Sequence, residues 1–271
     1  MSIIKAIILG LVQGFTEFLP VSSSGHLVLL QKIFGITEPT LFFDTMLHAG
    51  TLLAVMAVLW QDILAILRKI IQPLTFFLII ATIPAVIAAL AFGDAIEHAF
   101  ESGKFLGFCF LITSVILVIA EKLSRASAVY TLKKQENMNI LDAIIIGIMQ
   151  SIAIIPGISR SGATISGALF QKLERDFAAR FSFLLSIPAI LGALILQVKN
   201  LLKSGAAETA SENIGAAAVI AGTVTAAVIG FFAVKLMLKI VREKSLYGFA
   251  VYTAILGILI LIDQFTVRLI F

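Results

Sequence analysis

The fold is decided by the stretch from residue 13 to residue 26, which reads QGFTEFLPVSSSGH. It interrupts an apolar segment over residues 3–34 with a glutamine, a glutamate, a proline, three serines, a glycine and a histidine. Irregular polar backbone at membrane depth is stable only where it is buried in protein or lines a water-filled cavity. The stretch therefore predicts a re-entrant hairpin, in which two short helices enter and leave a membrane on the same side.

A second stretch of this kind covers residues 150–164, reads QSIAIIPGISRSGAT and interrupts an apolar segment over residues 140–170. Three short matches relate the two regions, namely GLVQ at 10–13 with GIMQ at 147–150, SSSG at 22–25 with SRSG at 159–162, and FDTML at 43–47 with FSFLL at 181–185. The first two pairs are 137 residues apart and the third is 138 apart. This nearly constant offset indicates an internal duplication.

The composition places the whole chain in a membrane. Its 271 residues are 60% hydrophobic and 13% charged, whereas a soluble domain is about 45–50% apolar and about 25% charged. Cys109 is the single cysteine, which excludes an intramolecular disulfide and a cysteine-rich zinc site. An ordinary soluble domain, a disordered chain and a disulfide scaffold are therefore excluded.

Uncharged runs locate the spans, because a transmembrane helix needs about 17–25 apolar residues. The six runs are residues 45–61, 70–93, 105–120, 181–198, 213–234 and 245–262. We predict an all-α polytopic membrane protein of one domain, residues 1–271, with six transmembrane helices and two re-entrant helical hairpins. Because each half has an odd number of spans, the halves form an inverted-topology repeat of about residues 1–125 and about residues 138–271.

The positive charges predict the orientation. If neither hairpin crosses the membrane, thirteen Lys and Arg residues fall on one face and six on the other, while Arg160 lies within the second hairpin. The positive-inside rule makes the richer face cytoplasmic, with both termini and the first hairpin outside. The net charge of +4 is interpreted as loop charge that sets this orientation, and no nucleic-acid partner is expected.

The first hairpin carries residues suited to acid–base and phosphate chemistry. Gln13 and Glu17 are four residues apart and share one face of a helix. Glu17 is the only acid in the hairpin, and an intramembrane carboxylate, which costs about 2.5–3.5 kcal/mol at a helix centre, indicates function. The serines at 22–24 open the next helix, where free N–H groups suit phosphate. His26 follows them and could carry a proton near neutral pH.

In the second hairpin, Arg160 stands at a predicted helix start between two serines. Its planar guanidinium can hold a phosphate through two parallel hydrogen bonds. If the hairpin tips meet at the midplane, Arg160 faces Glu17, Ser23 and His26. This combination predicts a site where a divalent cation bridges a diphosphate, with a nucleophile and a proton carrier beside it.

Each of these residues also has a structural interpretation. Glu17 and Arg160 could form only a buried salt bridge between the hairpins. The serines could only cap helices, and His26 could be a hydrogen-bonded structural histidine. His48, in the first predicted span, has no polar partner nearby in sequence and is interpreted as structural.

Residues 13–17 and the following PVSSSGH at 20–26, together with PGISRSGAT at 156–164, resemble the undecaprenyl-diphosphate phosphatase family of bacteria, also called the bacitracin-resistance proteins. The resemblance covers essentially the whole chain. It implies hydrolysis of undecaprenyl diphosphate to undecaprenyl phosphate and phosphate, which recycles the lipid carrier for peptidoglycan and other envelope polymers and confers bacitracin resistance. It also implies a multi-pass protein of the bacterial cytoplasmic (inner) membrane whose active site opens to the outer, periplasmic face.

The resemblance assigns roles to residues of both hairpins. The expected catalytic residues are Glu17, Ser23, His26 and Arg160. A divalent metal, Mg²⁺ or Ca²⁺, is expected on Glu17 and Gln13, the latter standing where some relatives have a glutamate. The expected substrate-binding residues are Ser22, Ser24, Gly25, Ser159, Ser161, Gly162 and Thr164.

Other interpretations stay open. A transporter or flippase of a prenyl phosphate lipid is the main alternative, because inverted repeats with broken helices are typical of transporters. A structural membrane subunit is disfavoured by the ionisable residues at membrane depth. The sequence leaves open whether Ser23 or a water molecule attacks phosphorus. The expected partners are an isoprenoid diphosphate lipid and membrane lipids, and a homodimer stays open beside a monomer.

Overall fold

The computed structural model describes residues 1–36, 40–127, 132–204 and 214–271, and this part of the chain is helical. The helices are α1 (Ile3–Thr16), α2 (Ser23–Ile33), α3 (Leu41–Val58), α4 (Trp60–Arg68), α5 (Pro73–Ser102), α6 (Leu106–Ser127), α7 (Ile140–Ile152), α8 (Arg160–Phe170), α9 (Arg175–Ser204), α11 (Ala216–Glu243) and α12 (Tyr247–Ile262). A 3₁₀ helix, Gln135–Asn137, precedes α7, and a π-helical turn, Asp263–Val267, follows α12. No described residue lies in a β-strand, so the predicted all-α class is confirmed.

The long helices have the length and the surface of membrane spans. Five of them, α5, α6, α9, α11 and α12, are long and apolar enough to cross a membrane, and α3 with α4 makes a sixth candidate. Large apolar side chains point outward, as for Leu90, Ile195 and Ile220, which are 70%, 66% and 63% exposed. Such a surface is stable against lipid tails and not against water. The protein is therefore a multi-pass membrane protein.

The first predicted span differs from the structure. The sequence predicted a span over residues 45–61, and in the structure this run contains a bend of 76° where α3 and α4 meet. The helix after the bend, α4, reads WQDILAILR. It is amphipathic, with its polar residues mainly on one side and its apolar residues mainly on the other. An amphipathic helix of this kind suits the interface between water and lipid. The chain therefore turns at Leu59, so the predicted run corresponds mainly to α3 and ends two residues beyond the bend.

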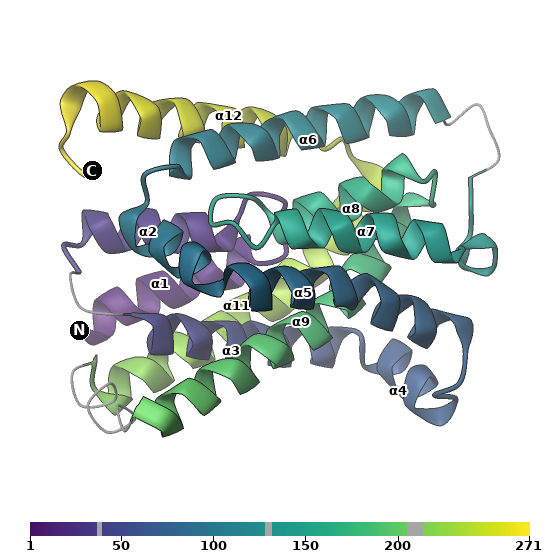
Figure 1. Ribbon diagram of the computed structural model, residues 1–271, viewed down its shortest axis with the longest axis horizontal. Coiled ribbons are helices and arrows are strands. Elements are labelled where there is room, and N and C mark those ends of the chain that lie inside the picture. The colour runs from purple at the N-terminus through teal and green to yellow at the C-terminus, as the bar shows by residue number, and fades with distance from the viewer. Residues whose placement is uncertain (37–39, 128–131, 205–213) are drawn as a thin grey trace.

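The helices form one elongated bundle, in which both termini lie at the same end and α4 lies at the other (Figure 1). The pair α1 and α2 and the pair α7 and α8 enter from opposite ends, and their connecting loops approach each other near the middle (Figure 1). Helix α1 packs on α11, and α7 packs on α5. Two more pairs, α3 with α9 and α6 with α12, join the first half of the chain to the second.

Glycines allow α1 to lie unusually close to α11. A Cβ atom added to Gly10 would overlap the backbone carbonyl oxygen of Gly222, and one added to Gly14 would lie 2.9 Å from the carbonyl oxygen of Ala226. Small residues at such contacts let backbones approach closely, which is the main source of helix association in lipid. This contact fixes α1, and with it the polar stretch that follows.

We expect Gly10→Ala to destabilise the protein by about 1–3 kcal/mol, because an added methyl group has no room at this contact. Gly192→Ala in α9 is the matched control, since a Cβ there would meet nothing within 4 Å. The measurement is thermal unfolding of both variants in the same detergent. Equal unfolding temperatures for the two variants would contradict the close contact of α1 and α11.

Candidate active site

The loops of the two helix pairs meet inside the bundle. Ser161 Oγ at the start of α8 donates to the backbone oxygen of Leu19, at 2.9 Å. Gly25 of α2 packs on the other loop, since an added Cβ would lie 3.0 Å from Gly157 Cα and 2.7 Å from the ring of Phe110. The structure thus brings the two polar stretches together, as the sequence analysis expected.

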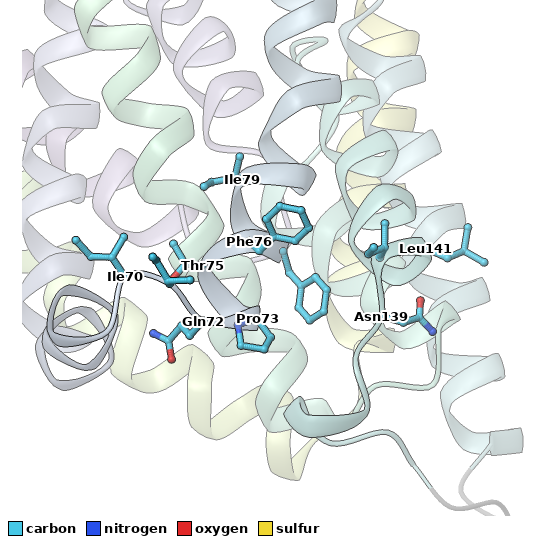
Figure 2. A pocket seen from close by; sticks show the side chains of 11 residues that line it. Ile70, Gln72, Pro73, Thr75, Phe76, Ile79, Asn139 and Leu141 are labelled. Carbon is cyan, nitrogen blue, oxygen red and sulfur yellow. The ribbon is translucent and has the colours of Figure 1, made fainter.

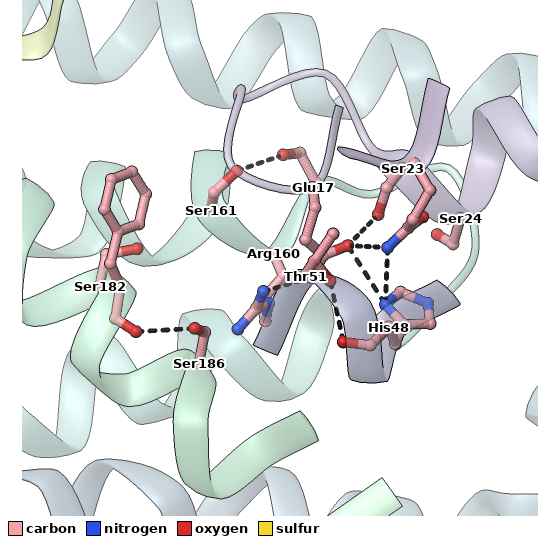
Figure 3. A network of polar contacts seen from close by, with 12 residues as sticks. Glu17, Ser23, Ser24, His48, Thr51, Arg160, Ser161, Ser182 and Ser186 are labelled. Carbon is pink, nitrogen blue, oxygen red and sulfur yellow. Dashed lines mark hydrogen bonds and ion pairs between the residues drawn. The ribbon is translucent and has the colours of Figure 1, made fainter. Parts of the chain in front are cut away.

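Glu17 is the centre of a polar network between these loops (Figure 3). Arg160 Nη2 donates to Glu17 Oε1 at 2.5 Å. Ser23 Oγ and Gln13 Nε2 donate to the other carboxylate oxygen, Oε2, at 2.5 and 2.9 Å. The Glu17 side chain is only 4% exposed. Three predicted site residues, Gln13 and Ser23 from the first stretch and Arg160 from the second, therefore donate to the buried carboxylate of a fourth, Glu17.

Two buried atoms of this network have no hydrogen-bond partner in the described part of the chain. They are Arg160 Nη1, a donor, and Gln13 Oε1, an acceptor. Buried polar atoms are nearly always paired in folded proteins. Arg160 Nη1 can donate a hydrogen bond to an anionic oxygen, and Gln13 Oε1 can bind a cation. The Glu17 network is therefore more than a closed salt bridge, because it offers one atom of each kind to a ligand.

His48 of α3 completes the network, although the sequence showed no partner for it. Its Nδ1 lies 2.9 Å from Gln13 Nε2 and 3.3 Å from Glu17 Oε2 (Figure 3). The signal that could have indicated it is the one used for Glu17, a polar side chain inside an otherwise apolar span. It was missed because the contact joins residues 35 positions apart in the chain.

His26 makes its described contacts away from Glu17. Its Nδ1 lies 2.6 Å from the carbonyl oxygen of Ser22, and its Nε2 lies 2.7 Å from the hydroxyl of Tyr252 in α12. A carbonyl only accepts, so Nδ1 carries a proton, and in the neutral ring Nε2 accepts from Tyr252. The two rings stack with 5.7 Å between centroids. Tyr252 is thus a partner that the sequence did not indicate, and it is one of two tyrosines in the uncharged run over residues 245–262.

Two predicted substrate-binding serines cap helices. Ser22 Oγ accepts from the backbone N–H of Gly25 at 3.3 Å at the start of α2. Ser159 Oγ accepts from the N–H of Gly162 at 3.0 Å at the start of α8. Ser22 has a φ of 68°, a left-handed conformation that is costly for a serine and recurs at functional turns. The capping interpretation therefore holds for Ser22 and Ser159, and both glycine amides are engaged.

The other predicted substrate-binding hydroxyls are also hydrogen-bonded within the protein. Ser24 Oγ lies 3.3 Å from Ser22 Oγ, and Thr164 Oγ1 lies 2.6 Å from Ser182 Oγ in α9. Ser161 is held by Leu19, as described above. These groups shape and fix the two loops around Glu17, and contact with a substrate stays a prediction for each of them.

An apolar groove of about 920 Å³ lies elsewhere, between the first turns of α5 and α7 (Figure 2). Its lining residues are Ile70, Ile71, Gln72, Pro73, Thr75, Phe76, Phe77, Ile79, Asn139, Ile140 and Leu141. They include no ionisable side chain and no residue of either polar stretch. The groove lacks the groups that phosphate chemistry needs, so the Glu17 network is the candidate site.

The donor set fits a cation that is shared with a substrate. Within the described residues, no three His, Cys, Asp or Glu side chains gather closely enough to hold a metal by themselves. Glu17 supplies one carboxylate, and Gln13 Oε1 supplies one unpartnered oxygen. Mg²⁺ is commonly bound by one or two carboxylates together with substrate phosphates and water. The residues therefore suit a hard cation that arrives with a phosphate ligand.

Apolar spans and a buried ionisable centre at two helix breaks define an integral membrane protein with a candidate site inside its bundle. Over residues 6–259 the chain matches the family of the bacitracin resistance protein BacA, and it belongs to this family. The resemblance seen in the two polar stretches is thereby confirmed.

Similar proteins match over almost their whole length. Undecaprenyl-diphosphatase of Carboxydothermus hydrogenoformans is 47% identical, over 97% of this chain and 98% of its own. Undecaprenyl-diphosphatase 4 of Bacillus cereus is 44% identical, over 98% of this chain and 99% of its own. Undecaprenyl-diphosphatase of Methanosphaera stadtmanae is 38% identical, over 97% and 98%.

We expect Tyr252→Phe to lower the unfolding free energy by about 1 kcal/mol, because His26 Nε2 loses its hydrogen-bond donor. The Nδ1–H tautomer of His26 should persist, since the Ser22 carbonyl still holds that proton. Thermal unfolding and ¹⁵N NMR of labelled histidine measure the two effects, with Tyr247→Phe as the matched control. A tautomer change in Tyr252→Phe would contradict the assignment of the Nδ1 proton.

Proposed function

We propose that this protein hydrolyses undecaprenyl diphosphate to undecaprenyl phosphate and inorganic phosphate at the Glu17 network. Membership of the BacA family and the names of full-length relatives support the activity. The observation that carries the site is the buried contact of Glu17 with Arg160 and Ser23, beside two unpartnered polar atoms. The reaction recycles the lipid carrier for peptidoglycan and other envelope polymers, in keeping with bacitracin resistance.

Arg160 binds the transferring phosphoryl group. Its Nη2 stays on Glu17, which fixes the plane of the guanidinium, and its Nη1 donates to a non-bridging phosphate oxygen. Negative charge on these oxygens must be stabilised as the phosphorus–oxygen bond breaks, which is the main catalytic requirement in phosphoryl transfer. A guanidinium that is already oriented by a buried carboxylate supplies this stabilisation without reorganisation.

Ser23 and Glu17 handle the attacking oxygen. Ser23 Oγ points its proton at Glu17 Oε2, so its lone pairs are available on the other side. In one route Oγ attacks the terminal phosphorus, undecaprenyl phosphate leaves with the bridging oxygen, and water then hydrolyses the phosphoserine. In the other route Ser23 orients a water molecule that attacks directly. Glu17 accepts the proton of the attacking oxygen in both routes.

Glu17 and Gln13 would hold a divalent cation, Mg²⁺ or Ca²⁺, through a carboxylate oxygen and the amide oxygen. Such an ion supplies positive charge that neutralises the diphosphate. His26 carries protons through Nε2 and the Tyr252 hydroxyl, because its Nδ1 proton is held by the Ser22 carbonyl. The loop residues Ser22, Ser24, Gly25, Ser159, Ser161, Gly162 and Thr164 form the cradle around the phosphates.

The proposal includes six spans and two re-entrant hairpins in an inverted repeat. Helix α3 makes the first span and α4 continues it along the interface between lipid and water, while α1 with α2 and α7 with α8 are the hairpins. In the repeat, α1, α3, α5 and α6 of the first half correspond to α7, α9, α11 and α12 of the second half. The packed pair α1 and α11 then corresponds to the packed pair α7 and α5, and α3 and α6 each pack on their own counterpart, α9 and α12. This packing supports the repeat. The protein lies in the bacterial inner membrane, its site opens to the outer face, and the prenyl chain lies in lipid or against apolar helices.

We expect Arg160→Lys to lower transition-state stabilisation by about 2–4 kcal/mol, because lysine keeps the charge but loses one oriented donor. The assay is phosphate release from undecaprenyl diphosphate by purified protein in detergent, where transport is impossible. Arg180→Lys is the control, since Arg180 is 44% exposed and forms ion pairs with Asp176 of α9 and Asp62 of α4, away from the Glu17 network. No phosphate release by the wild-type protein would favour the transporter alternative, and full activity of Arg160→Lys would make Arg160 a structural residue.

The orientation has its own test. Both termini should lie outside, because the face opposite them carries thirteen of the twenty Lys and Arg residues. An alkaline phosphatase fused to the C-terminus should be active in cells, and a reporter that fluoresces only in the cytosol should be dark there. The reverse pattern would contradict the outward-facing site.

A further inference from the structure

We infer that His48 is a positioning residue, which holds the Gln13 side-chain amide so that its oxygen stays free to bind a cation. The role of the cation rests on the proposed function, whereas the orientation of the amide rests on hydrogen-bond geometry alone. His48 Nδ1 lies 2.9 Å from Gln13 Nε2, inside the Glu17 network (Figure 3).

The carboxylate of Glu17 determines which end of the Gln13 amide faces it. Glu17 Oε2 lies 2.9 Å from the amide, and a carboxylate only accepts hydrogen bonds. The amide must therefore present its nitrogen there, because its oxygen would meet a second negative oxygen. Gln13 is fully buried, so water does not compete for this hydrogen bond.

The same nitrogen has a second hydrogen, and His48 accepts it. If His48 Nδ1 carried a proton, two N–H groups would face each other across 2.9 Å. Nδ1 is also 3.3 Å from Glu17 Oε2, a longer contact that it cannot serve as a donor while it accepts from Gln13. Neutral His48 therefore carries its proton on Nε2, and the Gln13 nitrogen has one acceptor on each side.

Two acceptors on the nitrogen fix the position of the oxygen. An amide held by one acceptor can still turn about its terminal bond, but one held by both Glu17 and His48 cannot. Gln13 Oε1 then lies on the far side, buried and without a partner among the residues that the structure describes. A carboxylate at position 13 would offer two equivalent oxygens and would need no such orientation, so His48 matters because position 13 is a glutamine.

His48 is itself held on a rigid element, as a positioning residue must be. The Thr51 hydroxyl donates to the His48 carbonyl at 2.9 Å. Two residues after His48, Gly50 lies so close to α11 that an added Cβ would overlap the carbonyl oxygen of Thr223. The packing of α3 on α11 therefore sets where the His48 ring stands relative to Gln13.

The first test is the Mg²⁺ dependence of phosphate release. We expect His48→Phe to raise the Mg²⁺ concentration for half-maximal activity about tenfold, because outer-shell partners typically contribute that much to metal affinity. In a Gln13→Glu background, the same substitution should leave the Mg²⁺ requirement unchanged. His48→Gln retains an acceptor oxygen and should restore most of the loss, while His98→Phe, on an exposed histidine, is the substitution control.

The second test needs no catalysis. Binding of Mn²⁺ to substrate-free protein, followed by electron paramagnetic resonance, should weaken in His48→Phe and not in His48→Phe combined with Gln13→Glu. ¹⁵N NMR should show the Nε2–H tautomer of His48. An equal loss in both backgrounds, or an Nδ1–H tautomer, would overturn the positioning role. Failure of the wild-type protein to release phosphate would instead overturn the proposed function. The Mn²⁺ binding measurement would still test the positioning role of His48.

Discussion

The burial of one carboxylate, Glu17, is the constraint on which the rest of the structure depends. An ionised group removed from water must be paired and hydrogen-bonded, and a pair with one partner missing is strongly destabilising. Glu17 has three donors, from Arg160, Ser23 and Gln13, and no single segment of chain could supply them all. Two broken helices and their caps are therefore needed to bring the donors to one point. The close packing of α1 on α11 then holds that point inside the bundle.

Much of the fold was predictable because lipid excludes charge. Uncharged runs gave the long helices, and polar interruptions gave the two helix pairs, since both signals lie within short stretches of sequence. The helix ends were less predictable: α11 continues to Glu243, well beyond its uncharged run, because long charged side chains can extend out of the apolar zone. The bend at Leu59 depends on the amphipathic character of nine residues, Trp60–Arg68, which a count of charges does not detect.

The candidate site was predictable in its chemistry but not in all its partners. Glu17 and Arg160 stood out because each is an ionisable residue in an apolar segment. His48 and Tyr252 were missed because their partners, Gln13 and His26, lie 35 and 226 residues away in the chain. The position of α3 in the bundle brings His48 to Gln13, and the position of α12 brings Tyr252 to His26. Ser22 illustrates the opposite case, since its neighbours in sequence predict both a phosphate contact and a helix cap. The structure shows the cap.

The pairing of Glu17 with Arg160 also sets an order of events during synthesis. The two residues are 143 positions apart, so the carboxylate leaves the ribosome long before its guanidinium exists. At translation rates of about 5–20 residues per second, the delay is roughly seven to thirty seconds. During that time the Glu17 carboxylate has no guanidinium partner, and an unpaired carboxylate is costly at membrane depth. The pairing of Glu17 with Arg160 therefore cannot form before residue 160 is made, and α1 gains its close contact with α11 (Ala216–Glu243) later still.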